Sequence, residues 1–542
     1  MNVVNNPLSS RQPLAAALTA DFARVGHLYE SDAADQASWS ARAAWLDETE
    51  KSRLDRKSLV QILRNYNNRY NSYPQVADSL NRLEQTGTVA IVGGQQSGLF
   101  TGPLLVIYKA ATIILAAKKA EAELGRPVVP VFWIAGEDHD WDEVNHTYVL
   151  SRDLKVTRIR LHREDDLRTP VGCTKVEEEE WNRVIQELDE LLPDTEFKPQ
   201  LINQLQSSSG GTLTASFATL IGNLFGRFGL ILLDSSDPEL RRLEKPVFEE
   251  LVKRNDELTA CYMEAAREVR QLGLETQADV AEDGANLFYI HEGERLLLFK
   301  HEDRYADRKG RVSFSKDELI QLAAKCPERF SNNVLTRPLM QEALLPVLGF
   351  VLGDGEIAYW GLLKKAFGVL GFKMPILLPR MSFTVVEGTL QKYMDKFGLS
   401  FEDVEERYQE RREAWLAEQD SLHLDTRFDE VKAAFGSMYE PLVEQLGTIQ
   451  NGLLKLGTSN KEKIYDQIEY LRDKAKDALA KSNEASLRHW DRIYLSLQPH
   501  GKLQERVYNV FYYLNRYGQD DWIDQIMSIP YETNGGHRLI LL

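Results

Sequence analysis

The chain has 542 residues, of which 43% are hydrophobic and 27% are charged, and it carries a formal net charge of −17. These values are typical of a globular protein with several domains and exclude a disordered or fibrous chain. The acidic balance argues against binding to nucleic acid and against attachment to an anionic membrane surface. The chain has no signal-peptide pattern, no apolar run that could cross a bilayer and only three widely spaced cysteines. We therefore expect a cytoplasmic protein without disulfides or structural zinc.

The first 86 residues show the spacing of helices, and Thr88–Val92 then predicts a short buried strand. This strand leads into the glycine-rich loop Gly93–Gly102. An apolar helix is expected over Pro103–Ala120, with Thr101 as its N-cap and Pro103 in its first turn.

Three further apolar runs end in polar turns and are predicted as strands: Val128–Ile134, Leu230–Leu233 and Pro375–Leu378. Short apolar strands that alternate with helices favour the α/β class with a parallel sheet. Ligands of such sheets bind beyond the carboxyl ends of the strands, and the densest polar clusters of the sequence follow these runs. We therefore expect the active site at this edge of the sheet.

Two segments do not fit this alternation and are interpreted as insertions. The first, 150–215, contains a predicted strand, Val156–Leu161, and an acidic helix, Glu177–Leu192. The second, 260–335, contains a predicted β-hairpin around His291–Glu294.

Beyond residue 383 the apolar side chains recur every three or four positions, which is the spacing of a coiled-coil seam. The seam of the first arm consists of Phe428, Val431, Phe435, Met438, Leu442, Leu446, Ile449, Leu453 and Leu456. Gly457 is expected to end this arm, and a second arm follows with the same spacing. Apolar seams on more than one side of such an arm need a partner, which favours a homodimer.

The loop Gly93–Gly102 has the spacing of neither a dinucleotide-binding fingerprint nor a P-loop. Its glycines would let the backbone approach a ligand, and the next helix would offer free N–H groups to an anion. A tight turn without a ligand is an equally good interpretation. Lys109, two turns into that helix, either reaches a carboxylate or phosphate of a ligand or lies along the surface.

The segment after the second strand holds five acids and two histidines in ten residues, from Glu137 to His146. Its carboxylates could bind an ammonium group or Mg²⁺, and His139 could take a proton near neutral pH. We favour a functional role over an exposed acidic turn, because the segment follows a buried strand and is flanked by the tryptophans Trp133 and Trp141. The ligand spacing of a transition-metal site is absent from the sequence.

Arg337 and the segment Gly353–Trp360 form a second candidate wall, because arginine binds a substrate carboxylate through two hydrogen bonds. A structural ion pair between Arg337 and one of the nearby acids is the alternative. Close to the end, Gln498–Arg506 and the tyrosines after it could hold a purine nucleotide, although tyrosines at helical spacing are more often core residues. The cysteines (Cys173, Cys261, Cys326) are interpreted as buried or inert.

Several of these motifs resemble one family. They are Gly94–Leu104 with Tyr108 and Lys109, Phe132–Asp140 through His146, Arg337-Pro338, Gly355–Trp360 and Pro499–Arg506. In this order along the whole chain, they are similar to the cysteine-adding enzymes of bacillithiol biosynthesis. The resemblance implies a Rossmann-like parallel-sheet core with two connecting insertions and a helical coiled-coil domain used for dimerisation.

The expected organisation combines this resemblance with the pattern of elements. It assigns 1–149 to N-terminal helices and the first half of the core, 150–215 to the first connecting insertion, 216–259 and 336–382 to the continued core, 260–335 to the second insertion, 383–497 to the coiled-coil domain and 498–542 to a C-terminal segment on the core.

The activity that the resemblance implies is ligation of cysteine to the amino group of glucosaminyl-malate, with ATP or ADP and Mg²⁺ as expected cofactors and neither zinc nor flavin. The expected catalytic residues are Glu137, Asp138, His139 and Asp142. The expected substrate-binding residues are Gln95, Gln96, Thr101, Gly102, Tyr108, Lys109, Trp133, His146, Arg337, Glu356 and Tyr359. The expected nucleotide-binding residues are His500, Gly501, Arg506, Asn509 and Tyr513. A synthetase-like nucleotidyl transferase and a non-catalytic scaffold are the alternatives.

Overall fold

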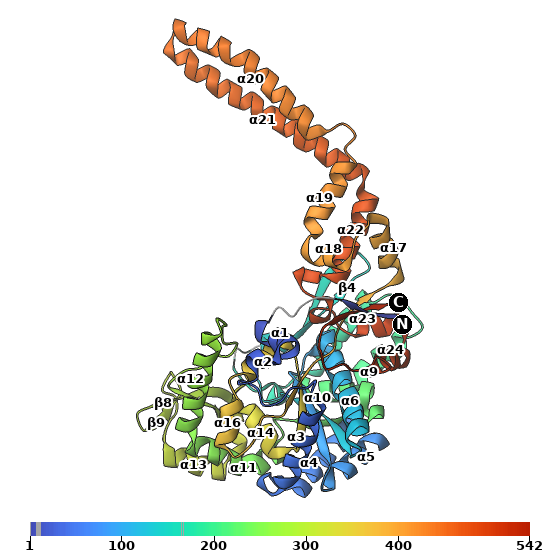
Figure 1. Cartoon of the computed structure of the whole chain (residues 1–542). Coiled ribbons are helices and arrows are strands. Elements are labelled where there is room, and N and C mark those ends of the chain that lie inside the picture. Colours follow the sequence, from blue (N-terminus) through green and yellow to red (C-terminus); the bar gives the residue numbers. More distant parts are fainter. Residues whose placement is uncertain (1, 7–11, 164, 166) are drawn as a thin grey trace. The chain divides into compact units, whose positions relative to one another are not determined.

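The computed structural model describes residues 2–6, 12–163, 165 and 167–542 (Figure 1). The chain forms two compact units. The first unit contains residues 1–385 and 504–541, and the second contains 386–503 with residue 542. Within the described ranges, no helix has the length and hydropathy needed to cross a membrane.

The core of the first unit is a five-stranded sheet in which all paired neighbours are parallel. Its strands, in spatial order, are β13 (Ile376–Pro379), β12 (Val347–Leu352), β2 (Val89–Gln95), β3 (Val128–Ile134) and β6 (Ile231–Asp234). Numbered along the chain and read from the β6 edge, this order is 3-2-1-4-5, which is the Rossmann order. The predicted parallel α/β core is therefore confirmed.

The four predicted core strands are confirmed, but β12 was not predicted, although every residue in it is buried. β2 is also longer than expected and includes Gly93 and Gly94. A Cβ on Gly93 would lie 2.8 Å from the Ile113 side chain, and one on Gly94 would lie 2.6 Å from the Trp133 carbonyl oxygen. These glycines therefore serve sheet packing, and the loop begins after them.

Helices of the amino-terminal half surround this sheet (Figure 1). They are α1 (Pro13–Ala20), α2 (Phe22–Val25), α3 (Gln36–Glu48), α4 (Arg56–Tyr70), α5 (Pro74–Glu84) and α6 (Leu104–Leu124). The largely buried α6 packs on β2 and β3, and α4 and α5 contact β6. The expected N-cap role of Thr101 is wrong: Pro103 precedes the first residue of α6, and Thr101 lies in a short 3-10 turn with φ 76°.

The first inserted region contains α7 (Trp141–Val144), β4 (His146–Leu150), β5 (Val156–Arg160), α8 (Glu178–Leu191) and α9 (Lys198–Ser207), and α10 (Leu213–Phe225) follows it. The predicted strand and acidic helix correspond to β5 and α8. β5 pairs antiparallel with β4, so that His146 lies opposite Arg160.

The second inserted region follows α11 (Pro238–Lys253) and begins with α12 (Asn255–Gln271). It continues with β7 (Gly284–His291), β8 (Glu294–His301), β9 (Arg304–Ala306), β10 (Ser313–Ser315), α13 (Lys316–Lys325) and β11 (Phe330–Asn332). The predicted hairpin is confirmed as β7 and β8, which belong to a sheet of order β10-β9-β8-β7-β11. The core then resumes with α14 (Arg337–Leu344), α15 (Asp354–Trp360) and α16 (Lys364–Val369).

The first and last strands, β1 (Asn2–Asn6) and β15 (His537–Leu541), pair in another sheet. β15 lies between β1 and β14 (Ser382–Val386). Two helices precede β15, α23 (Phe511–Tyr517) and α24 (Gln519–Met527). Residues 504–541 thus belong to the same unit as the Rossmann-like core.

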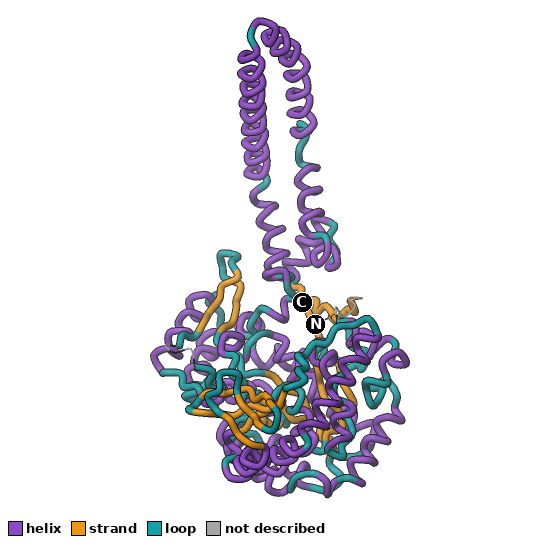
Figure 2. Tube along the Cα trace, turned by 90° about the vertical axis from the view of Figure 1, so that its left-hand side faces the viewer, coloured by secondary structure: helices purple, strands orange, loops and turns teal. Residues whose placement is uncertain are grey.

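The second unit is helical, with α17 (Gly388–Phe397), α18 (Phe401–Glu406), α19 (Tyr408–Glu418), α20 (Leu424–Ile449), α21 (Asn451–Ser482) and α22 (Glu484–Leu497). Figure 2 shows α20 and α21 running side by side as a long hairpin. The predicted end of the first arm at Gly457 is wrong, because the chain turns at Gln450. Gly457 lies inside α21, where a Cβ would come within 2.7 Å of the Val443 side chain.

The predicted seam is also only partly used inside this hairpin. Five of its residues are exposed: Val431, Met438, Leu442, Ile449 and Leu456. Gly436 and Val443 are instead the buried positions of α20, and Gly457 is the buried position of α21. Glycines thus let the two helices approach each other, and larger apolar side chains, four on α20 and one on α21, stay uncovered.

Candidate functional site

The core sheet changes winding direction between β2 and β12. In an open α/β sheet this switch point creates a crevice at the carboxyl ends of the strands, where ligands bind. β2 ends at Gln95, and the side chains of Gln95 and Gln96 lead to two separate clusters. The Gln95 Oε1 atom is 3.0 Å from the Lys109 amine, whereas the Gln96 amide donates to Asp138 at 2.7 Å and to Glu143 at 2.9 Å.

The first group, called here the lysine cluster, contains Gln95, Lys109, Arg337, Glu356 and Tyr359. Lys109 is 1% exposed, and its amine donates to the Gly94 carbonyl at 2.8 Å and to Glu356 Oε2 at 2.5 Å. Burial lowers the pKa of Lys109, and the Glu356 carboxylate only partly opposes this effect. The surface alternative for Lys109 is therefore excluded.

Glu356 and Arg337 complete the lysine cluster. The Glu356 carboxylate also accepts a hydrogen bond of 2.8 Å from the backbone N–H of Gly353, at the start of α15. Burial would raise the pKa of Glu356, but the charges of Lys109 and Arg337 outweigh it and lower that pKa. Arg337 donates to the Tyr359 hydroxyl at 2.5 Å, and its Nε has no partner within the described part of the chain. This cluster can therefore bind an anionic group.

The second group, called here the histidine cluster, contains Gln96, Asp138, His139 and Arg295. Arg295 comes from β8, and its Nη1 is 2.9 Å from His139 Nδ1 and 3.4 Å from Asp138 Oδ1. Burial and the charge of Arg295 lower the pKa of His139. For Asp138, burial would raise the pKa, but the charge of Arg295 and the hydrogen bond from Gln96 outweigh it and lower that pKa.

Glu137 lies behind this cluster in a buried network of charges. Its Oε2 accepts from Arg241 at 2.5 Å and from the backbone N–H of Asn332 at 3.0 Å. Arg241 also binds Glu244 at 2.8 Å, and burial raises the pKa of Glu244 to about 7. Within the described part of the chain, Glu137 Oε1 and both polar side-chain atoms of Asn332 have no hydrogen-bond partner. Buried polar groups without partners are costly, and such groups suit the recognition of a polar ligand.

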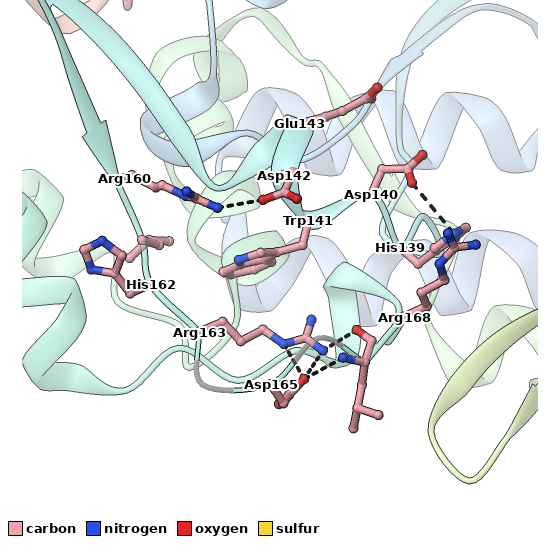
Figure 3. A pocket seen from close by; sticks show the side chains of 12 residues that line it. His139, Asp140, Trp141, Asp142, Glu143, Arg160, His162, Arg163, Asp165 and Arg168 are labelled. Atoms are coloured by element: carbon pink, nitrogen blue, oxygen red, sulfur yellow. Dashed lines mark hydrogen bonds and ion pairs between the residues drawn. The ribbon is translucent and has the colours of Figure 1, made fainter.

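A cavity of about 640 Å³ opens beside the histidine cluster (Figure 3). Twelve residues line it: His139, Asp140, Trp141, Asp142, Glu143, Arg160, Leu161, His162, Arg163, Asp165, Leu167 and Arg168. Asp142 pairs with Arg160 at 2.7 Å, and Figure 3 shows this pair next to Trp141 and apart from His139. The cavity thus offers an aromatic ring, carboxylates and arginines to a polar substrate.

The loop between β2 and α6 is held by the carboxyl-terminal segment. Phe100, Thr101 and Gly102 all have positive φ angles, of 51°, 76° and 72°, which is a strained conformation for the first two. The Asn509 side-chain amide donates to the carbonyls of Phe100 and Gly102, each at 2.8 Å. The first N–H of α6, at Leu104, donates to the Tyr508 carbonyl. Contrary to the prediction from the sequence, this N–H group is therefore not free to bind an anion.

A divalent cation does not fit the histidine cluster well. Asp138, His139 and Asp140 each offer one ligand atom, and these atoms lie within 4.8 Å of one another. However, the Arg295 guanidinium already contacts two of these three residues. A fixed positive charge at that position would repel the ion.

Several expected site residues lie apart from these clusters. Trp133 and Tyr108 are fully buried, Trp133 in β3 and Tyr108 in α6 against the ring of Phe383. Thr101 is buried in the loop, and His146 stacks edge-on with Tyr148. Among the expected nucleotide-binding residues, Tyr513 is buried in a stack with Trp522, and Asn509 binds the loop. His500 and Gly501 form a 3-10 turn of the second unit.

Sequence analysis did not identify Arg241, Arg295 or Asn332. Arg295 follows a hairpin turn, where charged residues are usually exposed, and no motif marks it. Asn332 lies five positions before Arg337, and it was not assigned a role. The cysteines are also less buried than expected: Cys173 is exposed, and Cys261 and Cys326 are half-buried.

Two family descriptions together cover nearly the whole chain. Residues 1–381 match the N-terminal Rossmann-like domain of the bacillithiol biosynthesis protein BshC, and residues 383–542 match its C-terminal coiled-coil domain.

Curated relatives with the same name align over most of their length. A protein of Geobacillus sp. (strain WCH70) named "Putative cysteine ligase BshC" is 37% identical over 503 residues, or 92% of each chain. Proteins with the same name are 37% identical in Geobacillus kaustophilus (strain HTA426), over 98% of each chain, and 36% identical in Bacillus cereus (strain Q1), over 90% of this chain and 91% of that one.

Proposed function

Because this chain belongs to the BshC family of bacillithiol biosynthesis, we propose that it is the ligase that joins the cysteine carboxyl group to the amino group of glucosaminyl-malate. The observation that carries the proposal is the pair of polar clusters at the switch point of the Rossmann-like sheet. An amide-forming ligase needs to hold a carboxyl compound and an amine side by side. Gln95 contacts the lysine cluster and the next residue, Gln96, contacts the histidine cluster, so the two clusters lie next to each other.

The lysine cluster is the proposed site of the carboxyl compound. Lys109 and Arg337 provide positive charge, and Gln95 and Tyr359 provide polar contacts beside them. Charge-assisted hydrogen bonds of this kind orient a carboxylate strongly. Asp138, Asp140 and Glu143 on the other side are the proposed contacts of the amine, because carboxylates stabilise an ammonium group.

A free carboxylate is a poor electrophile, so we propose that ATP activates the cysteine carboxyl group. The amine nitrogen then attacks the activated carbonyl carbon, the C–N bond forms, and the bond to the phosphate-bearing leaving group breaks. The amine proton passes to a carboxylate of the acidic side, a kind of step that contributes about 10²–10⁴-fold in rate. Arg506, which lies in the same unit as the Rossmann-like core, remains our proposed nucleotide contact.

The test is a reaction of the purified protein with cysteine, glucosaminyl-malate, ATP and Mg²⁺, followed by mass spectrometry. We expect the amide product, and we expect none when ATP is omitted. AMP release without an amine acceptor would indicate an adenylate. If neither the purified protein nor its addition to a lysate lacking only this chain gives product, the proposed reaction is wrong.

We also propose that the chain forms a homodimer through the hairpin of α20 and α21. Met438 is 72% exposed and Ile449 is 75% exposed, and both belong to a row of apolar residues at coiled-coil spacing. The double substitution Met438→Lys with Ile449→Lys should convert a dimer to a monomer in sedimentation velocity. Glu444→Lys with Thr448→Lys, at exposed polar positions of the same helix, is the matched control and should leave the dimer intact.

A further inference from the structure

Arg295 is held so firmly that its guanidinium has one available orientation. Its Nε donates to the Ser331 hydroxyl at 2.8 Å, and its Nη2 donates to the Asn332 carbonyl at 2.5 Å. The guanidinium carbon lies 3.7 Å from the centre of the Phe288 ring. The backbone N–H of Arg295 donates to the Arg168 carbonyl, which fixes the strand as well. The third nitrogen, Nη1, is thereby directed at His139.

This contact determines which nitrogen of His139 carries the proton. A guanidinium has only donors, so the His139 Nδ1 atom at 2.9 Å must accept with its lone pair. The neutral imidazole then carries its hydrogen on Nε2. The opposite tautomer would place two N–H groups against each other, and a doubly protonated ring would place two cations in contact.

The Nε2 side of the ring faces the cavity. Asp140 Oδ1 lies 3.7 Å from Nε2, beyond hydrogen-bond distance, and Figure 3 shows this pair beside Arg168 at the cavity wall. The groups around the ring are thus Arg295, Asp138, Asp140, Arg168 and the Phe288 ring. With its lone pair used by Arg295, His139 has only an N–H to offer a substrate.

We propose that His139 acts as a neutral hydrogen-bond donor through Nε2, rather than as the base, and that Arg295 is the positioning residue that fixes this state. The Nε2 hydrogen is directed to an oxygen of the bound substrate, and the amine proton goes to a carboxylate. This inference rests on the proposed ligase function for its consequence in catalysis, but the tautomer itself is a property of the free protein.

The tautomer is measured first, by ¹⁵N NMR of the wild-type protein labelled at histidine. The signals of His139 are assigned by their loss in His139→Gln. We expect a pyridine-like Nδ1 signal and a pyrrole-like Nε2 signal that stay constant between about pH 6 and 8. A protonated Nδ1, or signals averaged between tautomers as in free histidine, would overturn the proposal whatever the enzyme does.

Substitutions of Arg295 then test the positioning role. Arg295→Met should give averaged tautomer signals for His139, and Arg295→Lys, which keeps a charged donor, should restore most of the wild-type pattern. Arg304→Met, on the neighbouring strand β9, is the matched control and should change nothing. If Arg295→Met does not fold, the lysine variant and the wild-type spectrum still decide the question.

Activity separates a donor from a base. Removal of a donor to a developing charge costs about 10²–10³-fold in kcat, so His139→Ala should lose that much. His139→Gln keeps an N–H near the position of Nε2 but has no basic nitrogen, and it should retain kcat within about 10-fold of wild type because the donor remains. If both variants lose activity equally, by the ~10²–10⁴-fold expected for a base, the donor role is wrong. Absence of product with the wild-type protein would contradict the ligase function but not the tautomer.

Discussion

Lys109 is a buried cation whose main anionic partner, Glu356, is only partly covered. The side chain of Lys109 is 1% exposed and that of Glu356 is 25% exposed. Removing the lysine would leave the Glu356 carboxylate charged, partly desolvated and without its partner. Removing both charges should destabilise the fold less, because no unpaired charge would remain. Pairs of this kind are coupled, so single substitutions exaggerate the contribution of the ion pair.

We predict that Lys109→Met lowers the free energy of unfolding by about 1–3 kcal/mol, because Glu356 loses its partner. The double variant Lys109→Met with Glu356→Gln should recover part of this loss. Urea denaturation of the two single variants and the double variant provides the thermodynamic cycle. If the two losses simply add, the residues are not coupled and the ion pair is weaker than the geometry indicates.

At the level of single residues, the sequence revealed groups next to strand ends better than groups brought in from insertions. Asp138 and His139 directly follow a buried strand, and the structure places them together with Gln96. Arg295 joins them from β8, more than 150 positions away in the sequence. Because that contact depends on tertiary packing, no local spacing could predict it.

At the level of elements, strands with an isolated apolar run were predicted well, whereas a strand that directly follows an apolar helix was missed. β3 begins and ends where its apolar run does. β12 follows α14 in a nearly continuous apolar stretch, in which periodicity cannot separate a buried helix from a buried strand. Gly457 was predicted to end a helix because glycine has a low helix propensity. The local sequence does not reveal that the neighbouring helix packs so closely there that a side chain would not fit.

We predict opposite effects for two glycine substitutions in α21. Gly457→Ala should destabilise the hairpin by about 1–3 kcal/mol, since the new methyl group would overlap Val443. Gly452→Ala, where the same methyl group meets only a side-chain nitrogen at 3.9 Å, should stabilise it by up to about 1 kcal/mol through helix propensity. Thermal unfolding followed by circular dichroism tests both. Equal effects would mean that packing at Gly457 is looser than described.

The buried His537 makes the sheet of β1, β15 and β14 sensitive to acid. Its ring lies 2.7 Å from the Ser382 hydroxyl and 2.8 Å from the Thr384 hydroxyl, and Arg380, Glu505 and Asp354 are the charged groups around it. Burial lowers the pKa of His537 to about 4.

We therefore predict a stability term that is fully present above about pH 6.5, the unfolded pKa, and is lost as the pH falls toward 4. Its size is about 3 kcal/mol, because each pKa unit between the folded and unfolded values corresponds to about 1.4 kcal/mol. His537→Gln should flatten the pH dependence of the unfolding free energy over this window. An unchanged slope between pH 6.5 and 4 would contradict the assignment.

At the scale of the whole molecule, the loop of the candidate site depends on residues that lie about 400 positions later in the sequence. Asn509 binds the carbonyls of Phe100 and Gly102, and Tyr508 accepts from the first N–H of α6. The predicted Rossmann-like core and helical domain are confirmed, but this connection was not predicted. A motif search finds the loop and the carboxyl-terminal segment separately, and nothing in either one indicates that they bind each other.

We predict that Asn509→Ala lowers the free energy of unfolding by about 1–3 kcal/mol, because two buried carbonyls lose their donor. The strained loop should also become a site of limited proteolysis near Phe100. Asn534→Ala, at an exposed position of the same segment, is the control and should have neither effect. Resistance of the Asn509→Ala loop to protease would show that its conformation is held by other contacts.

The same connection has a consequence for biosynthesis on the ribosome. Phe100 and Asn509 are 409 positions apart, so at about 5–20 residues per second the loop waits roughly 20–80 s for its partner. During that time the loop between β2 and α6 lacks the hydrogen bonds from Asn509 that hold its conformation. A product terminated before Asn509 therefore cannot assemble this site, and only chains translated past that residue acquire it.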